Sequence, residues 1–183
     1  MIRKLKWITV SSKKVLKNKW FSLLHDKVKL PGGKIIDYFY MDYPGSIVIV
    51  PITNDNEVLM IEQYRYPVKK TCLEVPAGSQ EGEEPDVCAR RELEEEIGVK
   101  SDKITYLGSF YSSNSFSNEN VKVFLAEKLK YVKHKRDETE KSIKVKKRPF
   151  KKVVEDIKNG KIVDGLTIIA LLFTEKHLSL EDN

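Results

Sequence analysis

The chain has 183 residues, of which 33 are Lys or Arg and 27 are Asp or Glu, so its formal net charge is +6. This length is typical of one domain with a compact core. The composition, 40% apolar or aromatic and 33% charged, excludes an intrinsically disordered chain and an integral membrane protein. Cys72 and Cys88 are too few for a disulfide framework or a zinc ribbon, so we expect a cytoplasmic protein with reduced thiols. Apolar runs such as 47–52 and 168–173 are six residues long, well below the roughly 20 needed to span a bilayer, so we expect no membrane partner.

The charge is distributed unevenly along the sequence. Residues 1–40 carry ten basic and two acidic residues, a net +8, and residues 127–152 carry twelve basic and four acidic residues, again +8. Residues 72–99, here called the acidic segment, carry nine acidic and two basic residues, a net −7. The positive total therefore hides an acidic segment in a basic chain, and it does not by itself indicate a nucleic-acid partner.

The first part of the chain is predicted to form strands separated by turns, because short apolar runs alternate with Gly, Pro, Asn and Asp. Two neighbouring runs, split by Asn54-Asp55-Asn56, are expected to pair as a buried hairpin: Ser46–Thr53 and Glu57–Tyr64. The other expected strands are Val15–Asp26, Ile35–Met41 after a turn at 31–33, and Thr71–Val75.

The apolar spacing changes to a helical period between Pro85 and Ile97. Pro85 suits a first helical turn and Gly98 suits the position after the last one. Strands at the front and helices at the back indicate an α+β domain. The later expected elements are strands Lys103–Tyr111 and Val121–Leu129 around a polar loop Ser112–Asn120, a charged stretch Lys130–Lys147, and helices Phe150–Asn159 and Asp164–His177 with Asp164 as cap.

Three carboxylates share one side of the predicted helix. Glu92 and Glu96 are one turn apart, and Glu95 lies three residues from Glu92. Two such charges about 4 Å apart repel by roughly 1 kcal/mol in water and about 4 kcal/mol at an effective dielectric of 20. The cluster therefore favours a bound cation, and Mg²⁺ and Mn²⁺ prefer oxygen ligands of this kind. A solvated acidic helix face is the alternative explanation.

The acidic segment contains a longer pattern that decides between these explanations. Its parts are Glu74-x-Pro-Ala-Gly78, Glu81-Gly-Glu83, and Arg91-Glu92-x-x-Glu95-Glu96-x-Gly98-Val99. This pattern resembles the signature loop–helix–loop of the Nudix hydrolases. Every fixed position from Glu83 onwards is filled, but one loop residue fewer than in the family separates Gly78 from Glu83, which leaves Ala77 in the counted glycine position.

The resemblance implies roles for these residues. Glu92, Glu95 and Glu96 would bind catalytic Mg²⁺, or Mn²⁺ in its place, with the Ala77 carbonyl as a further ligand. Glu95 would also count among the catalytic residues. Glu83 and Arg91 would form a supporting ion pair that orients the metal ligands. The fold implied is the Nudix-type α/β/α sandwich with a mixed sheet, preceded by N-terminal antiparallel strands.

The flanking sequence is similar to one subfamily, the ADP-ribose pyrophosphatases and related nucleotide-sugar hydrolases. The shared features include Glu62-Gln-Tyr-Arg65 and Phe116-Ser-x-Glu119. The resemblance implies Mg²⁺-dependent hydrolysis of the pyrophosphate bond of a small-molecule nucleoside diphosphate sugar, giving a nucleoside monophosphate and a sugar phosphate. Asn114 stands where members that prefer ADP-ribose carry proline, so the sugar stays open.

Further site residues follow from the same subfamily. Arg65 would contact substrate phosphates, for which a guanidinium fork is suited, or else pair with Glu62 or Glu74. A loop after the strand Val121–Leu129 would supply the catalytic base, with two candidates: Glu138 and Glu140. Either of these acids is equally well explained as part of a solvated loop.

The N-terminal strands of the subfamily exchange contacts across a homodimer. We therefore expect a division into an N-terminal region, residues 1–45, that makes dimer contacts, and a Nudix hydrolase domain, residues 46–183. Trp20 or Phe21 would stack on the substrate base, although packing at the subunit interface explains an aromatic residue here equally well.

Two other functions fit parts of the sequence. The two basic segments suit a Nudix hydrolase that acts on another nucleoside diphosphate derivative such as an RNA cap, but 27 Lys against 6 Arg and the lack of an aromatic-basic motif disfavour nucleic acid. A nucleotide-binding module that has lost turnover is the third possibility, and the intact Glu92, Glu95 and Glu96 argue against it.

Overall fold

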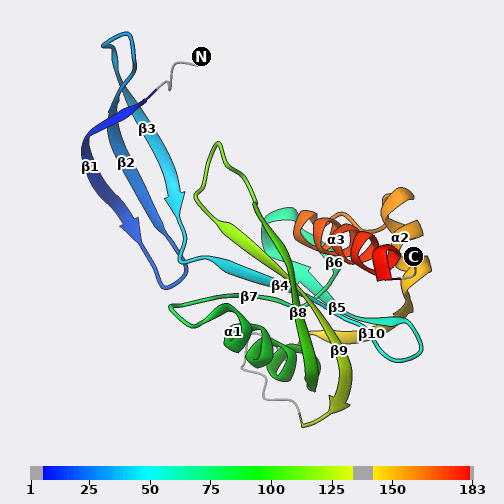
Figure 1. The fold of residues 1–183 in the computed structure, drawn as a ribbon. Coiled ribbons are helices and arrows are strands. Elements are labelled where there is room, and N and C mark those ends of the chain that lie inside the picture. Colours follow the sequence, from blue (N-terminus) through cyan, green and yellow to red (C-terminus); the bar gives the residue numbers. More distant parts are fainter. Residues whose placement is uncertain (1–5, 134–141, 182–183) are drawn as a thin grey trace. The chain divides into compact units, whose positions relative to one another are not determined.

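A computed structural model describes residues 6–133 and 142–181. The chain divides into two compact units, whose elements are drawn in Figure 1. The N-terminal unit comprises Met1–Pro44 and Tyr111–Asn120, and the main unit comprises Gly45–Phe110 and Val121–Asn183. No helix among the described residues is long and apolar enough to cross a membrane.

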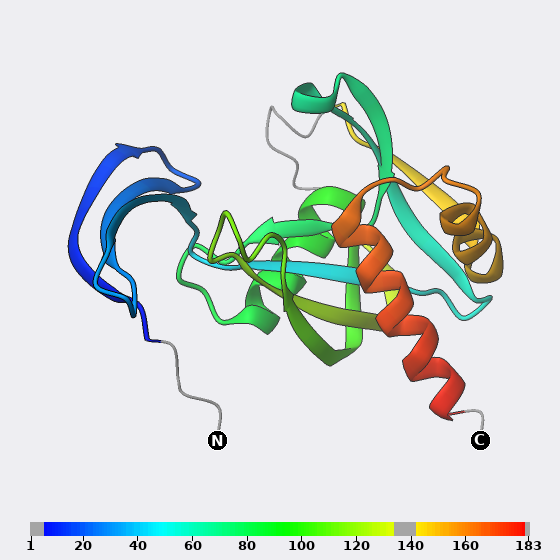
Figure 2. The ribbon, with the colours of Figure 1, turned by 90° about the horizontal axis from the view of Figure 1, so that it is seen from above.

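The N-terminal unit is built on a three-stranded antiparallel sheet in the order β1-β2-β3. Its strands are β1 (Ile8–Lys17), β2 (Ser22–Lys29) and β3 (Ile35–Asp42). The pairing of β1 with β2 shifts register at two places. Such irregularities bend a strand and increase its twist, and Figure 2 shows the three strands curving together.

The prediction of one strand over Val15–Asp26 is wrong, because Asn18 interrupts it. The Asn18 Oδ1 accepts hydrogen bonds from the backbone N–H groups of Trp20 and Phe21, at 2.8 and 2.9 Å. A side chain that satisfies backbone groups locally competes with the strand ladder. β1 ends before this turn and was not predicted, since all ten of its residues are exposed and its sequence has no regular apolar alternation.

The polar loop predicted at Ser112–Asn120 is confirmed as the connection between two long strands, and it belongs to the N-terminal unit. Backbone and side-chain hydrogen bonds attach it to β3. The Met41 N–H donates to the Phe116 carbonyl at 2.9 Å, and the Tyr38 hydroxyl donates to the Ser115 carbonyl at 2.9 Å.

The main unit contains two sheets. One has the order β7-β4-β9-β8, in which β4 pairs parallel with β9 and antiparallel with β7. The other has the order β10-β5-β6 and is antiparallel. The strands are β4 (Ser46–Pro51), β5 (Glu57–Arg65), β6 (Lys70–Glu74), β7 (Ala77–Ser79), β8 (Val99–Tyr111), β9 (Asn120–Tyr131) and β10 (Lys144–Pro149).

The predicted hairpin of β4 and β5 is wrong in its pairing. A turn joins them, since the Thr53 N–H donates to the Glu57 carbonyl at 2.9 Å, but beyond an isolated bridge between Ile52 and Val58 the strands separate into different sheets. Each of them is an interior strand with a partner on both edges. The partners β9 and β10 lie far along the chain, so local patterning does not reveal them.

β10 lies in the charged stretch for which no strand or helix was predicted. It pairs along β5 at an edge of its sheet, from Lys144 opposite Glu62 to Pro149 opposite Glu57. The Lys147 ammonium lies 3.5 Å from the Glu57 carboxylate. Lysine and proline are typical of edge strands, where they discourage pairing with other chains.

The helices begin and end near the predicted positions. Pro85 occupies the first turn of α1, and Gly98 follows the last turn in the left-handed conformation, with φ of 66°. Asp164 caps α3, because its Oδ2 accepts a hydrogen bond from the Thr167 N–H at 2.8 Å. The helical segments are η1 (Tyr66–Val68), α1 (Pro85–Glu92), the π-helical turn η2 (Leu93–Ile97), α2 (Phe150–Lys158) and α3 (Gly165–Glu181).

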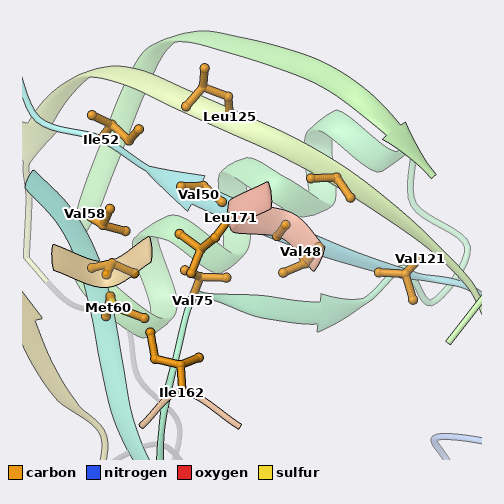
Figure 3. Packing of buried hydrophobic residues seen from close by; sticks show 13 residues of the cluster. Val48, Val50, Ile52, Val58, Met60, Val75, Val121, Leu125, Ile162 and Leu171 are labelled. Carbon is orange, nitrogen blue, oxygen red and sulfur yellow. The ribbon is translucent and has the colours of Figure 1, made fainter. Parts of the chain in front are cut away.

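Alternate residues of β4 face two separate hydrophobic cores. Ile47 and Ile49 pack with Leu93 and other apolar residues of α1 and η2. Val48 and Val50 pack with residues of α2 and α3, among them Leu171, as Figure 3 shows. Helices therefore cover both faces of the sheet that holds β4, and the predicted α/β/α sandwich with a mixed sheet and N-terminal antiparallel strands is confirmed.

Candidate active site

α1 and η2 carry the predicted metal ligands Glu92 and Glu96 beside their apolar stripe, on the buried part of the helix surface. Cys88, Ala89 and Leu93 are fully buried against β4, which fixes the rotation of the helix. Glu92 and Glu96 are only 6% exposed despite their charge. A buried carboxylate is costly unless it is paired or hydrogen-bonded, so these two positions need specific partners.

The sequence predicted a continuous helix from Pro85 to Ile97, but the α-helix ends at Glu92. It changes at Leu93 into the π-helical turn η2, which contains Glu94, Glu95 and Glu96. The wider turn rotates Glu95 and Glu96 relative to Glu92, compared with their positions in a continuous α-helix. Glu94 lies 3.4 Å from the Lys100 ammonium, outside the cluster formed by the other carboxylates.

Arg91 joins three acidic side chains. Its Nε donates to Glu83 at 2.9 Å, and its Nη1 donates to Glu92 at 2.7 Å and to Glu95 at 2.8 Å. Burial disfavours the charged guanidinium, but the Glu92 carboxylate and the hydrogen bonds to Glu83 and Glu95 outweigh it and raise the pKa of Arg91. The structure thus brings the predicted pair Glu83 and Arg91 together, and Arg91 holds two of the predicted metal ligands.

The backbone of the short strand β7 lies directly against the carboxylates of Glu92 and Glu96. A Cβ atom added to Gly78 would lie 1.9 Å from Glu92 Oε1, so any other residue here would force that carboxylate to shift. The Ala77 N–H donates to Glu96 Oε2 at 3.1 Å. Ala77 is therefore beside Glu96, and Gly78 is beside Glu92.

The chemistry of these residues fits a divalent cation. Glu92, Glu95 and Glu96 offer carboxylate oxygens, the donors that hard divalent ions prefer. Because Gly78 has no side chain, the Glu92 carboxylate can lie directly against its backbone. As arranged, no group of three or more His, Cys, Asp or Glu side chains among residues 6–133 and 142–181 is ready to hold a metal ion. The carboxylates instead pair with Arg91 and with the Ala77 N–H.

Arg65, at the end of β5, pairs with Glu74, which is the alternative that the sequence left open. Its Nε lies 2.9 and 3.1 Å from the two Glu74 oxygens, and its Nη2 donates to the same carboxylate. The hydrogen bonds to Glu74 raise the pKa of Arg65. Glu74 is 3% exposed, whereas 45% of the Arg65 side chain remains exposed, so the pair fixes the guanidinium without burying it.

Cys88 belongs to the packing and not to the chemistry. Its side chain is fully buried, and burial raises the pKa of the thiol to about 12. Both cysteines are free and buried.

Three other predicted site residues are not placed relative to this cluster. Trp20 lies in the N-terminal unit on the turn after β1, 54% exposed, with the Lys19 ammonium 4.6 Å from its ring centroid. Glu138 and Glu140 lie outside the described residues. The roles of all three stay predictions.

The sequence reasoning missed two polar residues next to the cluster. Gln80 is 8% exposed and accepts a hydrogen bond from the Lys122 ammonium at 2.7 Å. The only local signal is a charged residue, Lys122, inside the otherwise apolar run Val121–Ala126 of β9. Its partner is 42 residues earlier in the chain, which no local pattern indicates.

Comparison with known proteins finds two family matches along the chain. Residues 42–158 match the family described as NUDIX domain. The chain belongs to the Nudix hydrolase family. Residues 7–41 match a second family, described as nucleoside diphosphate sugar hydrolase N-terminal domain. Nudix hydrolases generally use divalent metal ions, which agrees with the donor set around Glu92 and Glu96.

Relatives cover nearly the whole Nudix chain. An ADP-ribose pyrophosphatase of Bacillus subtilis (strain 168) is 31% identical over 175 residues, covering 94% of this chain and 95% of the relative. A methanol dehydrogenase activator of Bacillus methanolicus is 32% identical over 176 residues with the same coverage. The crystal structure of an ADP compounds hydrolase superimposes with a TM-score of 0.83 at 18% identity, covering 98% of both chains, which supports the fold.

Proposed function

We propose that this Nudix hydrolase cleaves the pyrophosphate bond of ADP-ribose or a related nucleoside diphosphate sugar, giving a nucleoside monophosphate and a sugar phosphate. The observation that carries the proposal is the carboxylate cluster around Arg91, set against a glycine that has no room for a side chain. The name of the Bacillus subtilis relative supports this substrate class.

Mg²⁺, with Mn²⁺ as a substitute, is the proposed cofactor. Glu92, Glu95, Glu96 and the Ala77 carbonyl would hold it. A divalent ion held there would supply positive charge that stabilises the substrate's pyrophosphate during attack by water. Glu83 and Arg91 keep Glu92 and Glu95 oriented, and their ion pair is present at 2.9 Å.

The chain's own residues supply the remaining functions. Arg65, held by Glu74 through Nε and Nη2, is oriented to bind a substrate phosphate with the exposed part of its guanidinium. Glu138 or Glu140 would accept the proton of the attacking water, with Glu95 as a further catalytic carboxylate. Water attacks one phosphorus, the bond from that phosphorus to the bridging oxygen breaks, and the bridging oxygen leaves on the other phosphate.

The N-terminal region, residues 1–45, is proposed to make the contacts of a homodimer, with residues 46–183 as the hydrolase domain. The family match over 7–41 and the separate N-terminal sheet support this division. Trp20 would stack on the substrate base or pack at the subunit interface. The cytoplasmic location stays a prediction, based on the two free cysteines.

Two matched substitutions in η2 test the proposal. Glu96→Gln removes a buried carboxylate of the cluster, and Glu94→Gln removes the neighbouring one that pairs with Lys100 instead. With ADP-ribose and a panel of nucleotide sugars in Mg²⁺, we expect Glu96→Gln to lower kcat by about 100-fold or more, in the range seen for groups around metal sites. Glu94→Gln should stay within about twofold of the wild type.

The result that contradicts the proposal is equal turnover by wild type and Glu96→Gln in a preparation that melts cooperatively. A wild type that binds nucleotide sugars and cleaves none of them with Mg²⁺ or Mn²⁺ supports a binding module instead.

A further inference from the structure

The turn before α1 has an unusual backbone for its sequence. The Glu83 N–H donates to the Gln80 carbonyl at 2.7 Å, which closes a four-residue turn. Its central residues, Glu81 and Gly82, both have positive φ, 46° and 89°, as in a type I′ turn. Glycine adopts this conformation freely, but glutamate does so at a cost. The turn spans the part of the signature loop that is one residue shorter than the family pattern, so other contacts must hold it.

Gln80 makes those contacts on both sides of the turn. Its backbone N–H donates to the Gly45 carbonyl at 3.1 Å, which ties the turn to the start of β4. Its side-chain Nε2 donates to the Glu83 carbonyl at 3.3 Å, across the turn. With the side chain buried, both ends of the amide are used, since Oε1 accepts from Lys122. Gln80 is therefore a brace inside the turn.

Lys122 anchors that brace to the sheet. It lies on β9, directly opposite Ile47 of β4, and Ile47 is opposite Gly78 of β7. Directly paired residues on neighbouring strands present their side chains to the same face. Ile47 belongs to the core with α1, so Lys122 reaches Gln80 from the face that α1 covers.

The braced turn ends at the residue that holds Arg91. Glu83 closes the turn, and its carboxylate accepts the Arg91 Nε. Arg91 then pairs with Glu92 and Glu95. A continuous chain of contacts leads from Lys122 through Gln80 and Glu83 to the carboxylates of the site. Displacement of the turn would move Glu83 and release one edge of the guanidinium.

We propose that Lys122 and Gln80 are positioning residues of the carboxylate site: they hold the shortened signature loop so that Glu83 keeps Arg91 between Glu92 and Glu95. This inference rests on the proposed function for its catalytic consequence, but its structural consequence is measurable without substrate.

The test uses Lys122→Met, which keeps the aliphatic stem and removes the ammonium, and Gln80→Met, which removes the side-chain amide with both its donor and its acceptor. Lys122→Arg is the conservative rescue. Lys130→Met is the matched control, because Lys130 lies on the same strand and pairs with Asp102 at 2.6 Å, away from the loop. Melting curves establish that each variant folds, and either Met variant alone carries the test if the other does not.

Two readouts are independent of turnover. In ¹⁵N NMR of the metal-free protein, the Arg91 Nε–H signal, assigned through Arg91→Lys, should exchange with solvent about tenfold faster in both Met variants, because its carboxylate partner is displaced. Titration with Mn²⁺ followed by electron paramagnetic resonance should show about tenfold weaker binding, as for other groups that orient metal ligands. Lys122→Arg should recover most of both losses, and Lys130→Met should match the wild type.

Turnover separates positioning from direct substrate contact. We expect kcat to fall by about tenfold at fixed metal concentration with substrate KM within about twofold, and the double variant should lose no more than either single variant, since both act through one turn. A raised KM with unchanged kcat and Mn²⁺ affinity means that Lys122 contacts substrate, and it overturns the inference. An unchanged Arg91 signal also overturns it. If the wild type cleaves no nucleotide sugar, the proposed function fails, while the signal and the Mn²⁺ titration still decide this inference.

Discussion

Charged side chains are buried and paired in the acidic segment, whereas they are exposed to solvent in the N-terminal sheet. In the acidic segment, Glu92 and Glu96 are 6% exposed, and a single guanidinium joins Glu83, Glu92 and Glu95. In the N-terminal sheet all ten residues of β1 are exposed, and the ion pair of Lys27 with Asp37 leaves each side chain 53% exposed. Buried charge with fixed partners marks a site, whereas exposed charge keeps its hydration.

The comparison explains why the net charge of +6 carries little information about function. The positive total comes from residues that mostly face solvent, and the acids of the family pattern are a few residues within one acidic segment. Substitutions of equal size in the two regions should therefore have unequal effects.

The largest difference should come from glycine substitutions. Gly78→Ala places a Cβ 1.9 Å from Glu92 Oε1, so the carboxylate or the strand must move. We expect a loss of about 100-fold in kcat and of roughly 1–3 kcal/mol in unfolding free energy. In Gly32→Ala, in the turn between β2 and β3, the added Cβ meets nothing within 4 Å, so neither kcat nor the unfolding free energy should change. Equal effects of the two substitutions on kcat and on denaturant unfolding would contradict the proposed difference between the two regions.

The second largest difference should be between the loss of the Arg91 ion pairs and the loss of the Lys27 ion pair, measured as stability against unfolding. Arg91→Met leaves Glu83, Glu92 and Glu95 without their shared guanidinium. We expect a loss of roughly 1–3 kcal/mol in unfolding free energy, less than for a fully buried pair because a third of the side chain is exposed. Lys27→Met removes one of two partners of the exposed Asp37, which keeps His25 at 2.6 Å, and should leave the melting temperature unchanged. Urea titrations of both variants measure the difference, and a Lys27→Met loss as large as that of Arg91→Met would contradict it.

The exposed lysines should affect catalysis only through long-range attraction of the anionic substrate. Basic residues that attract an anionic substrate raise kcat/KM at low ionic strength. We expect kcat/KM for a nucleotide sugar to fall by about three- to tenfold between roughly 20 and 200 mM salt, with kcat nearly constant. A flat profile would leave these lysines with a role in solvation alone.

The smallest expected change concerns the two thiols of the acidic segment, Cys72 and Cys88. Burial raises the pKa of Cys88 to about 12, so almost none of it is thiolate at pH 8. Burial also raises the pKa of Cys72. Iodoacetamide should leave native protein unmodified over an hour and label both cysteines in urea, as mass spectrometry would show. Rapid labelling of native Cys88 would mean that the segment opens.

Features with a local cause were predictable from the sequence. Pro85, Gly98 and Asp164 mark helix ends through their own backbone or capping chemistry, and the structure confirms all three. The pairing of Glu83 with Arg91 followed from a family pattern whose residues fall on one loop and one helix.

Features with a distant cause were not predictable. β4 and β5 look like a hairpin locally, yet β9 and β10, more than fifty residues away, provide their partners. β10 has an edge-strand sequence rich in lysine, which resembles a charged loop. The contact of Lys122 with Gln80 and the change to a π-helical turn at Leu93 depend on packing that only the folded chain creates.

The most direct test of the central claim is ³¹P NMR of purified protein mixed with ADP-ribose and then with other nucleoside diphosphate sugars, with Mg²⁺ or with excess EDTA. We predict that at least one of these nucleoside diphosphate sugars is converted to equal amounts of nucleoside monophosphate and sugar phosphate, and that EDTA stops the conversion. Cleavage that continues in EDTA, or no cleavage of any nucleoside diphosphate sugar with Mg²⁺ or Mn²⁺, would contradict it.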